Sequence, residues 1–274
     1  MLGERVVWVN AAGCFTMLAV FPYTPFRGSW LYTTMASAPA GAQGIRDALD
    51  VLQARGRLRP EEDVQVVVVA GDGSTYDMAL SSTSGAIWRG LDFWYLCYDN
   101  ESYGNTGVQM SSATPYAART QTTPVTARTA EGMGQRRKDL FEIWRAHQPA
   151  YVATVSPRYP MDLARKLEKA RALRGPKLIL AAAPCPTGWE FDPAKTYDVA
   201  RLQVETGLFP LKEAAGGGPV VHTHVPGKRR PVEDYLRRQG RFRHLFEPVR
   251  QDAVIQRIQA DVDRYWASVA AAAR

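Results

Sequence analysis

Several features that would assign a protein to a common class are missing from this chain of 274 residues. No run of 18 or more apolar residues occurs, so the sequence contains no candidate transmembrane helix. The N-terminal segment MLGERVVWVN lacks the charged, apolar and small-residue regions of a signal peptide. The G-x-S-x-G elbow, the Walker loop and the G-x-G-x-x-G fingerprint are absent too, which argues against serine hydrolases, P-loop proteins and dinucleotide-binding proteins. We therefore expect a cytoplasmic protein of another class.

Cysteine and histidine are scarce, with three and four residues respectively. Cys97 lies inside the apolar run FWYLCY, and we expect it to be a small buried hydrophobic residue. Cys14 and Cys185 each follow an expected strand. His222 and His224 could bind a metal ion, but they lie in a Gly/Pro-rich segment without a nearby cysteine or carboxylate, so we expect them at the surface.

The composition is that of a globular enzyme-sized chain, with 46% hydrophobic residues. We expect one α/β domain over residues 1–215 and a C-terminal extension over residues 216–274 that packs on a larger complex. The net charge is +7, but the basic residues are spread along the chain. This pattern favours a solvated or intersubunit surface over a nucleic-acid site, and attraction of an acidic electron carrier is a third interpretation.

Apolar strand patterns alternate with helical patterns, which is typical of a parallel sheet covered by helices on both faces. A long segment without periodicity, residues 104–135, follows the third strand pattern and is expected to be a functional loop. Residues 216–231 are expected to form an exposed connection. The expected strands are 5–10, 64–70, 93–98, 151–155 and 177–183, and the expected helices are 41–55, 159–173, 232–236 and 253–268.

Polar residues follow two neighbouring strand patterns, and ligands of open α/β sheets bind at such carboxyl ends. Gly71, Asp72 and Gly73 follow the run VQVVVVA, and Asp99-Asn100-Glu101-Ser102 follows FWYLCY. Magnesium prefers about six oxygen ligands, of which one or two are carboxylates and others come from substrate phosphates. Asp72 would supply the charge, with neutral oxygens from the Asn100 amide and the Ser102 carbonyl. Gly-Asp-Gly alone is a common turn, but the combination predicts a metal-diphosphate site.

In such a site the small glycines would let the backbone approach a diphosphate closely, and the amides of Gly73 and Ser74 could donate to its oxygens. Glu101 adjoins the expected ligands. Strand alternation points its side chain away from Asn100, so we interpret it as structural.

The chain resembles the beta subunits of the 2-oxoacid:ferredoxin oxidoreductase family, and most closely those acting on pyruvate. The likeness runs from about Val6 to about Trp266, so it does not depend on one motif. It includes the spacing of Gly-Asp-Gly to Asp-Asn, and the segments YGNTGVQMSSATPYAARTQTTP, AHQPAYVATVSPRYPMDLARKL, APCPTGW, ARLQVETGLFPLKE and PVEDYLRRQGRFRHL.

The resemblance implies a thiamine diphosphate-binding fold with Mg²⁺ as the second cofactor. By position, magnesium would be bound by Asp72, Asn100 and the Ser102 carbonyl. Thr106 would join Gly71, Gly73 and Ser74 near the diphosphate, and Asn105 would face the reacting carbons. One departure is small: Asp99 stands where many thiamine enzymes have an asparagine.

The reaction implied is coenzyme A-dependent oxidative decarboxylation of pyruvate to acetyl-CoA and CO2, with electrons passed to ferredoxin. The implied partners are an alpha subunit, which binds the pyrimidine and supplies the activating glutamate, and gamma and ferredoxin-like delta subunits. Three alternatives stay open: 2-oxoisovalerate as substrate, 2-oxoglutarate as substrate, or a non-catalytic assembly subunit. A self-sufficient thiamine decarboxylase would normally need a longer chain.

In the family, Cys14 and Cys185 would be two of the four cysteine ligands of a 4Fe-4S cluster. The other two come from an upstream Cys-x-x-Cys pair, but only 13 residues precede Cys14 and none is cysteine. We therefore expect no complete cluster from this chain alone. A partner could supply the pair, or the cluster could be lost. Our preferred hypothesis is that the native gene encodes roughly 20 to 40 further N-terminal residues with the pair.

Overall fold

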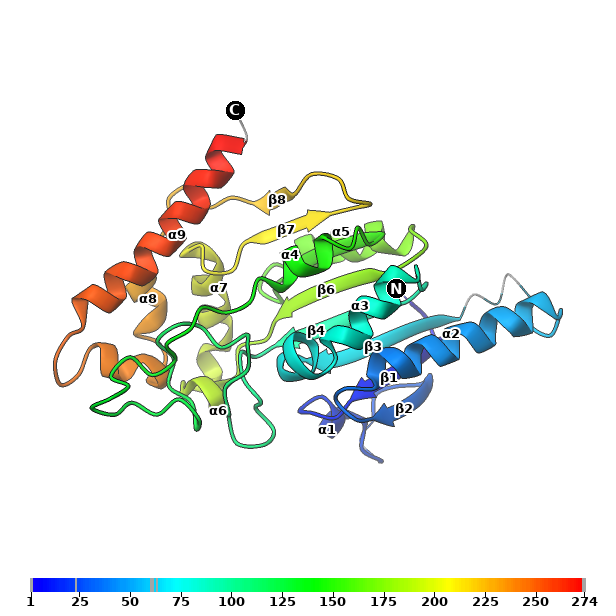
Figure 1. The fold of residues 1–274 in the computed structure, drawn as a ribbon, viewed down its shortest axis with the longest axis horizontal. Helices are drawn as coiled ribbons and strands as arrows, with labels where there is room; N and C mark the ends of the chain where they lie inside the picture. The colour runs from blue at the N-terminus through cyan, green and yellow to red at the C-terminus, as the bar shows by residue number, and fades with distance from the viewer. Residues whose placement is uncertain (1, 23, 60–61, 63, 273–274) are drawn as a thin grey trace.

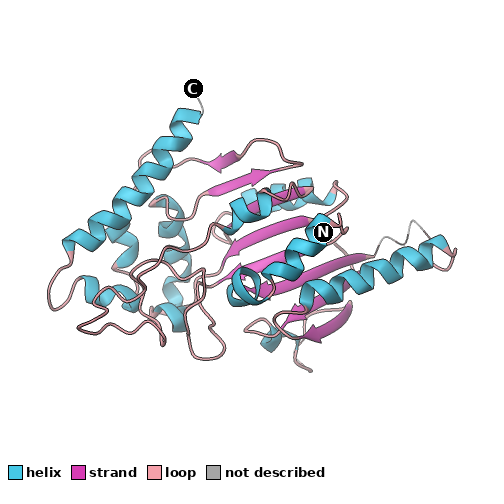
Figure 2. Cartoon of the chain, in the orientation of Figure 1, coloured by secondary structure: helices cyan, strands magenta, loops and turns pink. Residues whose placement is uncertain are grey.

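The computed structural model describes residues 2–22, 24–59, 62 and 64–272, and a central sheet organises this part of the chain (Figures 1 and 2). The described strands lie in the order β2-β1-β3-β4-β6-β5-β7-β8. The six from β2 to β5 are parallel, whereas β7 is antiparallel to β5 and β8 is antiparallel to β7. The strands are β1 (Val6–Ala11), β2 (Ser29–Thr33), β3 (Gln65–Gly71), β4 (Trp94–Asp99), β5 (Tyr151–Val155), β6 (Lys177–Ala182), β7 (Leu211–Ala214) and β8 (Val221–His224).

Helices cover both faces of the sheet. The first core cluster joins one face of the sheet to residues of α2, α3 and α4, and a second cluster joins the opposite face to α5. The α-helices are α1 (Thr16–Ala19), α2 (Ala38–Ala54), α3 (Leu80–Trp88), α4 (Leu140–Arg145), α5 (Pro160–Arg171), α6 (Pro186–Trp189), α7 (Thr196–Glu205), α8 (Val232–Leu236) and α9 (Asp252–Ala272). A π-helix, η1 (Gly73–Met78), and two 3₁₀-helices, η2 (Pro193–Lys195) and η3 (Gly240–Leu245), complete the described helices.

The two covered faces explain why the central strands are apolar throughout rather than alternating. In β3, Val66 and Val68 belong to the cluster on the α2 side, while Val67 and Val69 belong to the cluster on the opposite side. All four are buried. The α/β fold predicted from the sequence, mostly parallel with helices on both faces, is confirmed.

The C-terminal part of the chain forms a third hydrophobic cluster, which lies at the carboxyl end of the parallel strands. Residues of α8, η3 and α9 pack there with Trp189 and with residues 116–118 of the long loop. Figure 1 shows α9 crossing this end of the molecule. The extension predicted at residues 216–274 thus packs on its own chain, and packing on other subunits stays a prediction.

The five predicted strands lie within one residue of the observed ones at each end. The prediction that residues 216–231 form only a connection is wrong, because they contain β8. This strand has four residues and pairs through a bulge, so its pattern is too short to detect. The loop at 104–135 has no helix or strand beyond an isolated bridge between Tyr103 and Gln109. Within the described ranges, no helix is both long and apolar enough to cross a membrane.

Candidate functional site

The predicted ligand residues meet at the carboxyl edge of β3 and β4. These strands are parallel and paired with Gly71 opposite Tyr98, so the residues that follow them lie side by side. They line a cavity of about 270 Å³. Its lining includes Cys14, Gly71, Asp72, Gly73, Asn100, Ser102, Asn105 and Thr106.

Polar atoms of Asp72, Asn100 and Ser102 converge in this cavity. In one of the two orientations of the Asn100 amide, its Oδ1 lies 2.7 Å from the Ser102 carbonyl oxygen and 2.8 Å from Asp72 Oδ1. None of these atoms carries a hydrogen when Asp72 is ionised, so they repel one another unless a cation lies between them or the amide rotates by 180° and donates to both. Adjacent ligands of octahedral Mg²⁺ are themselves roughly 3 Å apart. The donor set therefore fits the magnesium ion that the sequence predicts.

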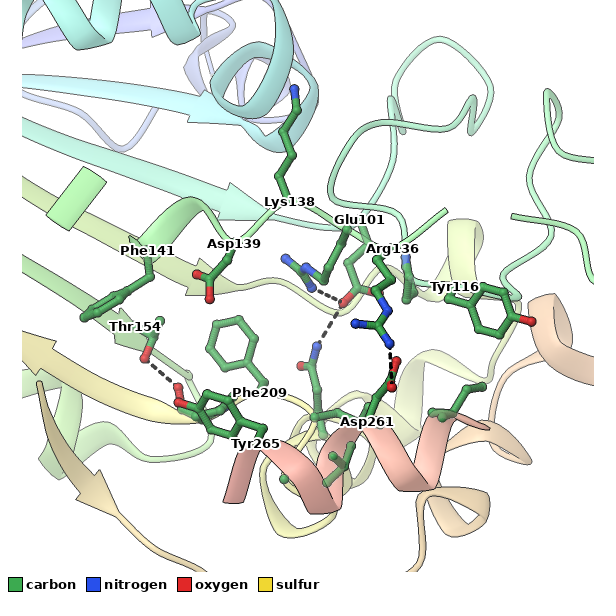
Figure 3. A pocket seen from close by; sticks show the side chains of 18 of the residues that line it. Glu101, Tyr116, Arg136, Lys138, Asp139, Phe141, Thr154, Phe209, Asp261 and Tyr265 are labelled. Atoms are coloured by element: carbon green, nitrogen blue, oxygen red, sulfur yellow. Dashed lines mark hydrogen bonds and ion pairs between the residues drawn. The ribbon is translucent and has the colours of Figure 1, made fainter. Parts of the chain in front are cut away.

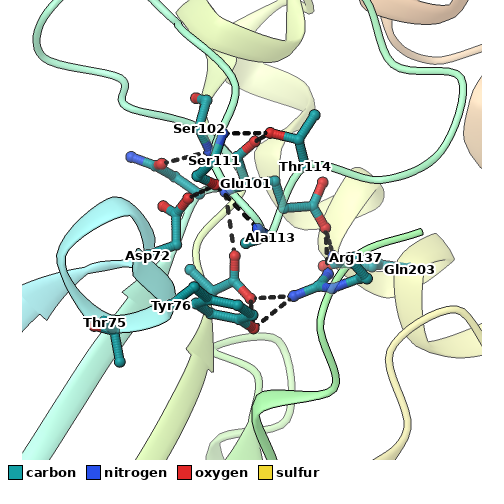
Figure 4. Close-up of polar contacts among 12 residues, drawn as sticks. Asp72, Thr75, Tyr76, Glu101, Ser102, Ser111, Ala113, Thr114, Arg137 and Gln203 are labelled. Carbon is teal, nitrogen blue, oxygen red and sulfur yellow. Dashed lines mark hydrogen bonds and ion pairs between the residues drawn. The ribbon is translucent and has the colours of Figure 1, made fainter. Parts of the chain in front are cut away.

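The electrostatic surroundings of Asp72 also favour a bound cation. Its side chain is fully buried. Burial and the nearby Asp99 carboxylate raise the pKa of Asp72 well above its usual range, although the Ser111 hydroxyl, which donates to Oδ2, opposes this shift. Figure 4 shows Ser111 reaching Asp72 from the long loop. A divalent cation would stabilise the ionised form that burial disfavours. Ser111 was not predicted, because no local pattern links it to Asp72.

The backbone at Gly73, where the sequence predicts a diphosphate, lies against an aromatic ring. A Cβ atom at Gly73 would overlap the ring of Tyr103, whose hydroxyl donates to the Gly73 carbonyl oxygen at 3.0 Å. The glycine is thus required by packing as well as by the predicted close approach of a diphosphate. Ser74 does not line the cavity, and its hydroxyl donates to the Met35 carbonyl at 2.5 Å. Only its backbone amide is left for the predicted role.

Asn105 and Thr106 are exposed and line the cavity. The Thr106 hydroxyl is hydrogen-bonded within its own loop, to Gln109 Oε1 and, at 3.3 Å, to the Tyr103 carbonyl. The structure brings both residues to the site, and their predicted contacts with a cofactor stay predictions.

Cys185 lies close enough to Cys14 to affect its thiol electrostatically. Burial, Cys185 and Asp72 together raise the pKa of the Cys14 thiol. Cys14 lines the cavity, and its sulfur lies 3.9 Å from Asn100 Nδ2. Cys185 instead caps α6, where its sulfur accepts from the Gly188 amide at 3.2 Å. Two thiolates do not complete a 4Fe-4S cluster, and the described residues hold no group of three or more His, Cys, Asp or Glu side chains that could bind a metal.

Glu101 anchors the loop that follows β4, which carries Asn100 and Ser102. Its backbone has φ of 64°, in the left-handed region, and its carboxylate is buried. Oε1 lies 3.1 Å from Arg137 Nη1 (Figure 4). Oε2 lies 2.5 Å from Arg241 Nη2. Arg137 also pairs with Asp99. The structural role predicted for Glu101 fits these contacts, but both arginines were missed because they are 36 and 140 residues away in the sequence.

Comparison with known proteins identifies the family. Residues 11–181 match the family described as thiamine pyrophosphate enzyme, C-terminal TPP binding domain. The pyruvate synthase subunit PorB of Methanosarcina barkeri is 42% identical, over 95% of this chain and 86% of that protein. The chain belongs to the PorB-type thiamine pyrophosphate enzymes. The ketoisovalerate oxidoreductase subunit VorB of Pyrococcus abyssi is 40% identical, over 89% of this chain and 78% of that protein.

A solved structure supports the fold of this PorB-type chain. A 2-oxoglutarate:ferredoxin oxidoreductase from Magnetococcus marinus superposes with a TM-score of 0.54 and 18% identity, covering 82% of this chain and 74% of that one. The predicted family and the predicted thiamine diphosphate-binding fold are confirmed. The expectation of an enzyme subunit is confirmed as well.

Proposed function

We propose that this chain is the thiamine diphosphate- and Mg²⁺-binding beta subunit of a pyruvate:ferredoxin oxidoreductase. The observation that carries the proposal is the convergence of the Asp72 carboxylate, the Asn100 amide and the Ser102 carbonyl at the carboxyl edge of the sheet. Bound thiamine diphosphate supplies the electron sink for decarboxylating the 2-oxoacid. Coenzyme A accepts the acyl group and ferredoxin accepts the electrons.

The chain's own residues hold and orient the cofactor. Asp72, Asn100 and the Ser102 carbonyl bind the metal, and Ser111 fixes the second oxygen of Asp72. The amides of Gly73 and Ser74 and the side chain of Thr106 face the diphosphate. Asn105, at the exposed side of the cavity, faces the reacting carbons.

The surroundings of the cavity support the proposal that another chain completes the site. Met17 and Tyr32 line the cavity, and 67% and 55% of their surfaces are exposed. Phe21, on the segment after α1, is 85% exposed. Exposed apolar side chains gathered in one region are typical of protein interfaces. An alpha subunit that binds the pyrimidine and supplies the activating glutamate would cover them, with gamma and ferredoxin-like delta subunits in the same complex.

The choice of pyruvate as substrate rests on a small difference in sequence identity between two groups of relatives. PorB proteins are 36–44% identical to this chain, and VorB proteins reach 40%. Pyruvate is therefore favoured, and 2-oxoisovalerate is the second candidate. The test is kcat/KM of the assembled complex for both acids, and a higher value for 2-oxoisovalerate would replace pyruvate in this proposal.

The cofactor assignment is tested by Asp72→Asn, which keeps the side-chain size and removes the charge. We expect calorimetry to show at least about a tenfold loss of thiamine diphosphate affinity in Mg²⁺, because the diphosphate is held through the cation. Asp47→Asn, an exposed acid on α2, serves as the matched control and should bind like the unmodified chain. Unchanged affinity in Asp72→Asn would refute the assignment.

A further inference from the structure

A second cavity, of about 360 Å³, lies on the other side of the Glu101 anchor. Its lining includes residues 136–141, residues of β5 and β6, the residues before β7, and one side of α9. Among the described residues, it shares no lining residue with the cavity that Asp72, Asn100 and Ser102 line. An apolar cavity of about 150 Å³ is enough to hold benzene, and small-molecule sites begin near 300 Å³. The space is therefore large enough for a ring-containing ligand.

The walls of this cavity differ from end to end. Figure 3 shows Phe141, Phe209 and Tyr265 on one side, with Glu101 and Arg136 on the other. Phe209, which precedes β7, is buried, and Phe141 is buried on α4. An aromatic wall of this kind favours a flat, apolar ligand body.

The charged groups that line the cavity already have partners. Arg137 pairs with Asp99 and Glu101, and Arg136 pairs with Asp261 at 2.8 Å. Lys212 Nζ lies 3.3 Å from Glu142 and 4.2 Å from the centre of the Phe141 ring. A ligand therefore needs no charge of its own to balance the site.

Among the described residues that line this cavity, one buried side-chain polar atom, Gln203 Oε1, has no hydrogen-bond partner. Gln203 is 2% exposed, and its Nε2 donates to Glu101 Oε1 at 3.2 Å. Since the carboxylate can only accept, this contact fixes the amide orientation. Among the described residues, no donor reaches Gln203 Oε1. A buried acceptor without a donor is unfavourable, so the cavity selects a ligand that brings an N–H or O–H group.

We propose that this cavity is a second ligand site, which binds a small uncharged aromatic molecule whose single N–H or O–H group donates to Gln203 Oε1. Because the Glu101 anchor separates the two cavities, such a molecule binds together with thiamine diphosphate and does not compete with it. The proposal does not depend on which 2-oxoacid the enzyme uses.

Indole and benzofuran test the proposal, because they share one shape and differ in that only indole has a donor. Binding is measured by ligand-observed NMR on the full chain and on the assembled complex, with and without thiamine diphosphate and Mg²⁺. We expect indole to bind about tenfold more tightly than benzofuran in every case. Equal affinities would overturn the proposal, since they would show that water satisfies Gln203. Absence of binding to the complex would also overturn it, since it would show that another subunit fills the cavity.

Two variants locate the site. Gln203→Met removes the acceptor at similar size and should bring the two affinities within about twofold of each other. Ile258→Trp, on the α9 wall, should fill the space and abolish binding of both probes. Retained thiamine diphosphate binding shows that each variant is folded. Indole binding that survives Ile258→Trp, or that is displaced by thiamine diphosphate, would place the ligand elsewhere and refute the proposal.

Discussion

Asn100 is the residue whose chemistry decides between two states of the site. With its amide oxygen facing Asp72 and the Ser102 carbonyl, it has the orientation that the proposed metal ligand needs, and with the amide rotated it becomes a donor to both oxygens. A metal ion and a rotated amide therefore stabilise the same loop in alternative ways.

The first residue-scale prediction compares Asn100→Ala with Ser102→Ala. Loss of the Asn100 oxygen should raise the Mg²⁺ concentration needed for thiamine diphosphate binding by about tenfold or more. Ser102→Ala should leave it unchanged, because the ligand is the backbone carbonyl and Ser102 Oγ has no partner among the described residues. A Mg²⁺ titration followed by tryptophan fluorescence measures both. Equal effects in the two variants would contradict the ligand assignment.

The sequence predicted Asp72 and Asn100 because each directly follows a strongly apolar strand, which fixes it at the edge of the sheet. Ser111 and Tyr103 could not be predicted in the same way. Ser111 reaches Asp72 from an irregular loop, and the contact of Tyr103 with Gly73 depends on how that loop folds back. Positions in loops are set by tertiary contacts, which have no period in the sequence.

At the scale of elements, the loop after β4 is held by buried charges that come from distant parts of the chain. Arg137 precedes α4 and Arg241 lies in η3, and both contact Glu101. The C-terminal cluster of α8, η3 and α9 is therefore connected to the metal-ligand loop through this carboxylate. Sequence patterns predicted the strands β1, β3, β4, β5 and β6, whereas β2, β7 and β8 and this ion cluster were missed.

Glu101→Gln tests the connection. The substitution leaves the buried Arg241 without its carboxylate, so the free energy of unfolding should fall by about 3 kcal/mol. The matched control is Glu190→Gln, which removes the partially exposed pair with Arg119 and should cost less than about 1 kcal/mol. Urea denaturation measures both, and similar losses would show that Glu101 does not anchor the loop.

At the scale of the whole molecule, the cavity with the converging oxygens has exposed apolar residues on its rim. No catalytic acid or base is assigned to this chain, and the activating glutamate is expected from the alpha subunit. The fold and the placement of the predicted ligand residues at one edge of the sheet follow from the sequence, because they depend on one chain. The completed active site does not, because in our proposal it depends on surfaces that another chain contributes.

The purified chain alone should therefore fail to decarboxylate pyruvate, even with saturating thiamine diphosphate and Mg²⁺. Adding the alpha subunit and the other partners should restore CO2 release and ferredoxin reduction. Radiolabelled CO2 release measures the first step. Turnover by the single chain would identify a self-sufficient decarboxylase instead.

We propose that Asp72, Asn100 and the Ser102 carbonyl bind the cation that holds thiamine diphosphate. Crystals grown with thiamine diphosphate and Mn²⁺, which accepts the same oxygen ligands as Mg²⁺, would locate this cation by anomalous scattering. We expect one peak about 2.2 Å from each of Asp72 Oδ1, Asn100 Oδ1 and the Ser102 carbonyl oxygen. A peak elsewhere, with the Asn100 amide nitrogen donating to Asp72 and Ser102, would contradict it.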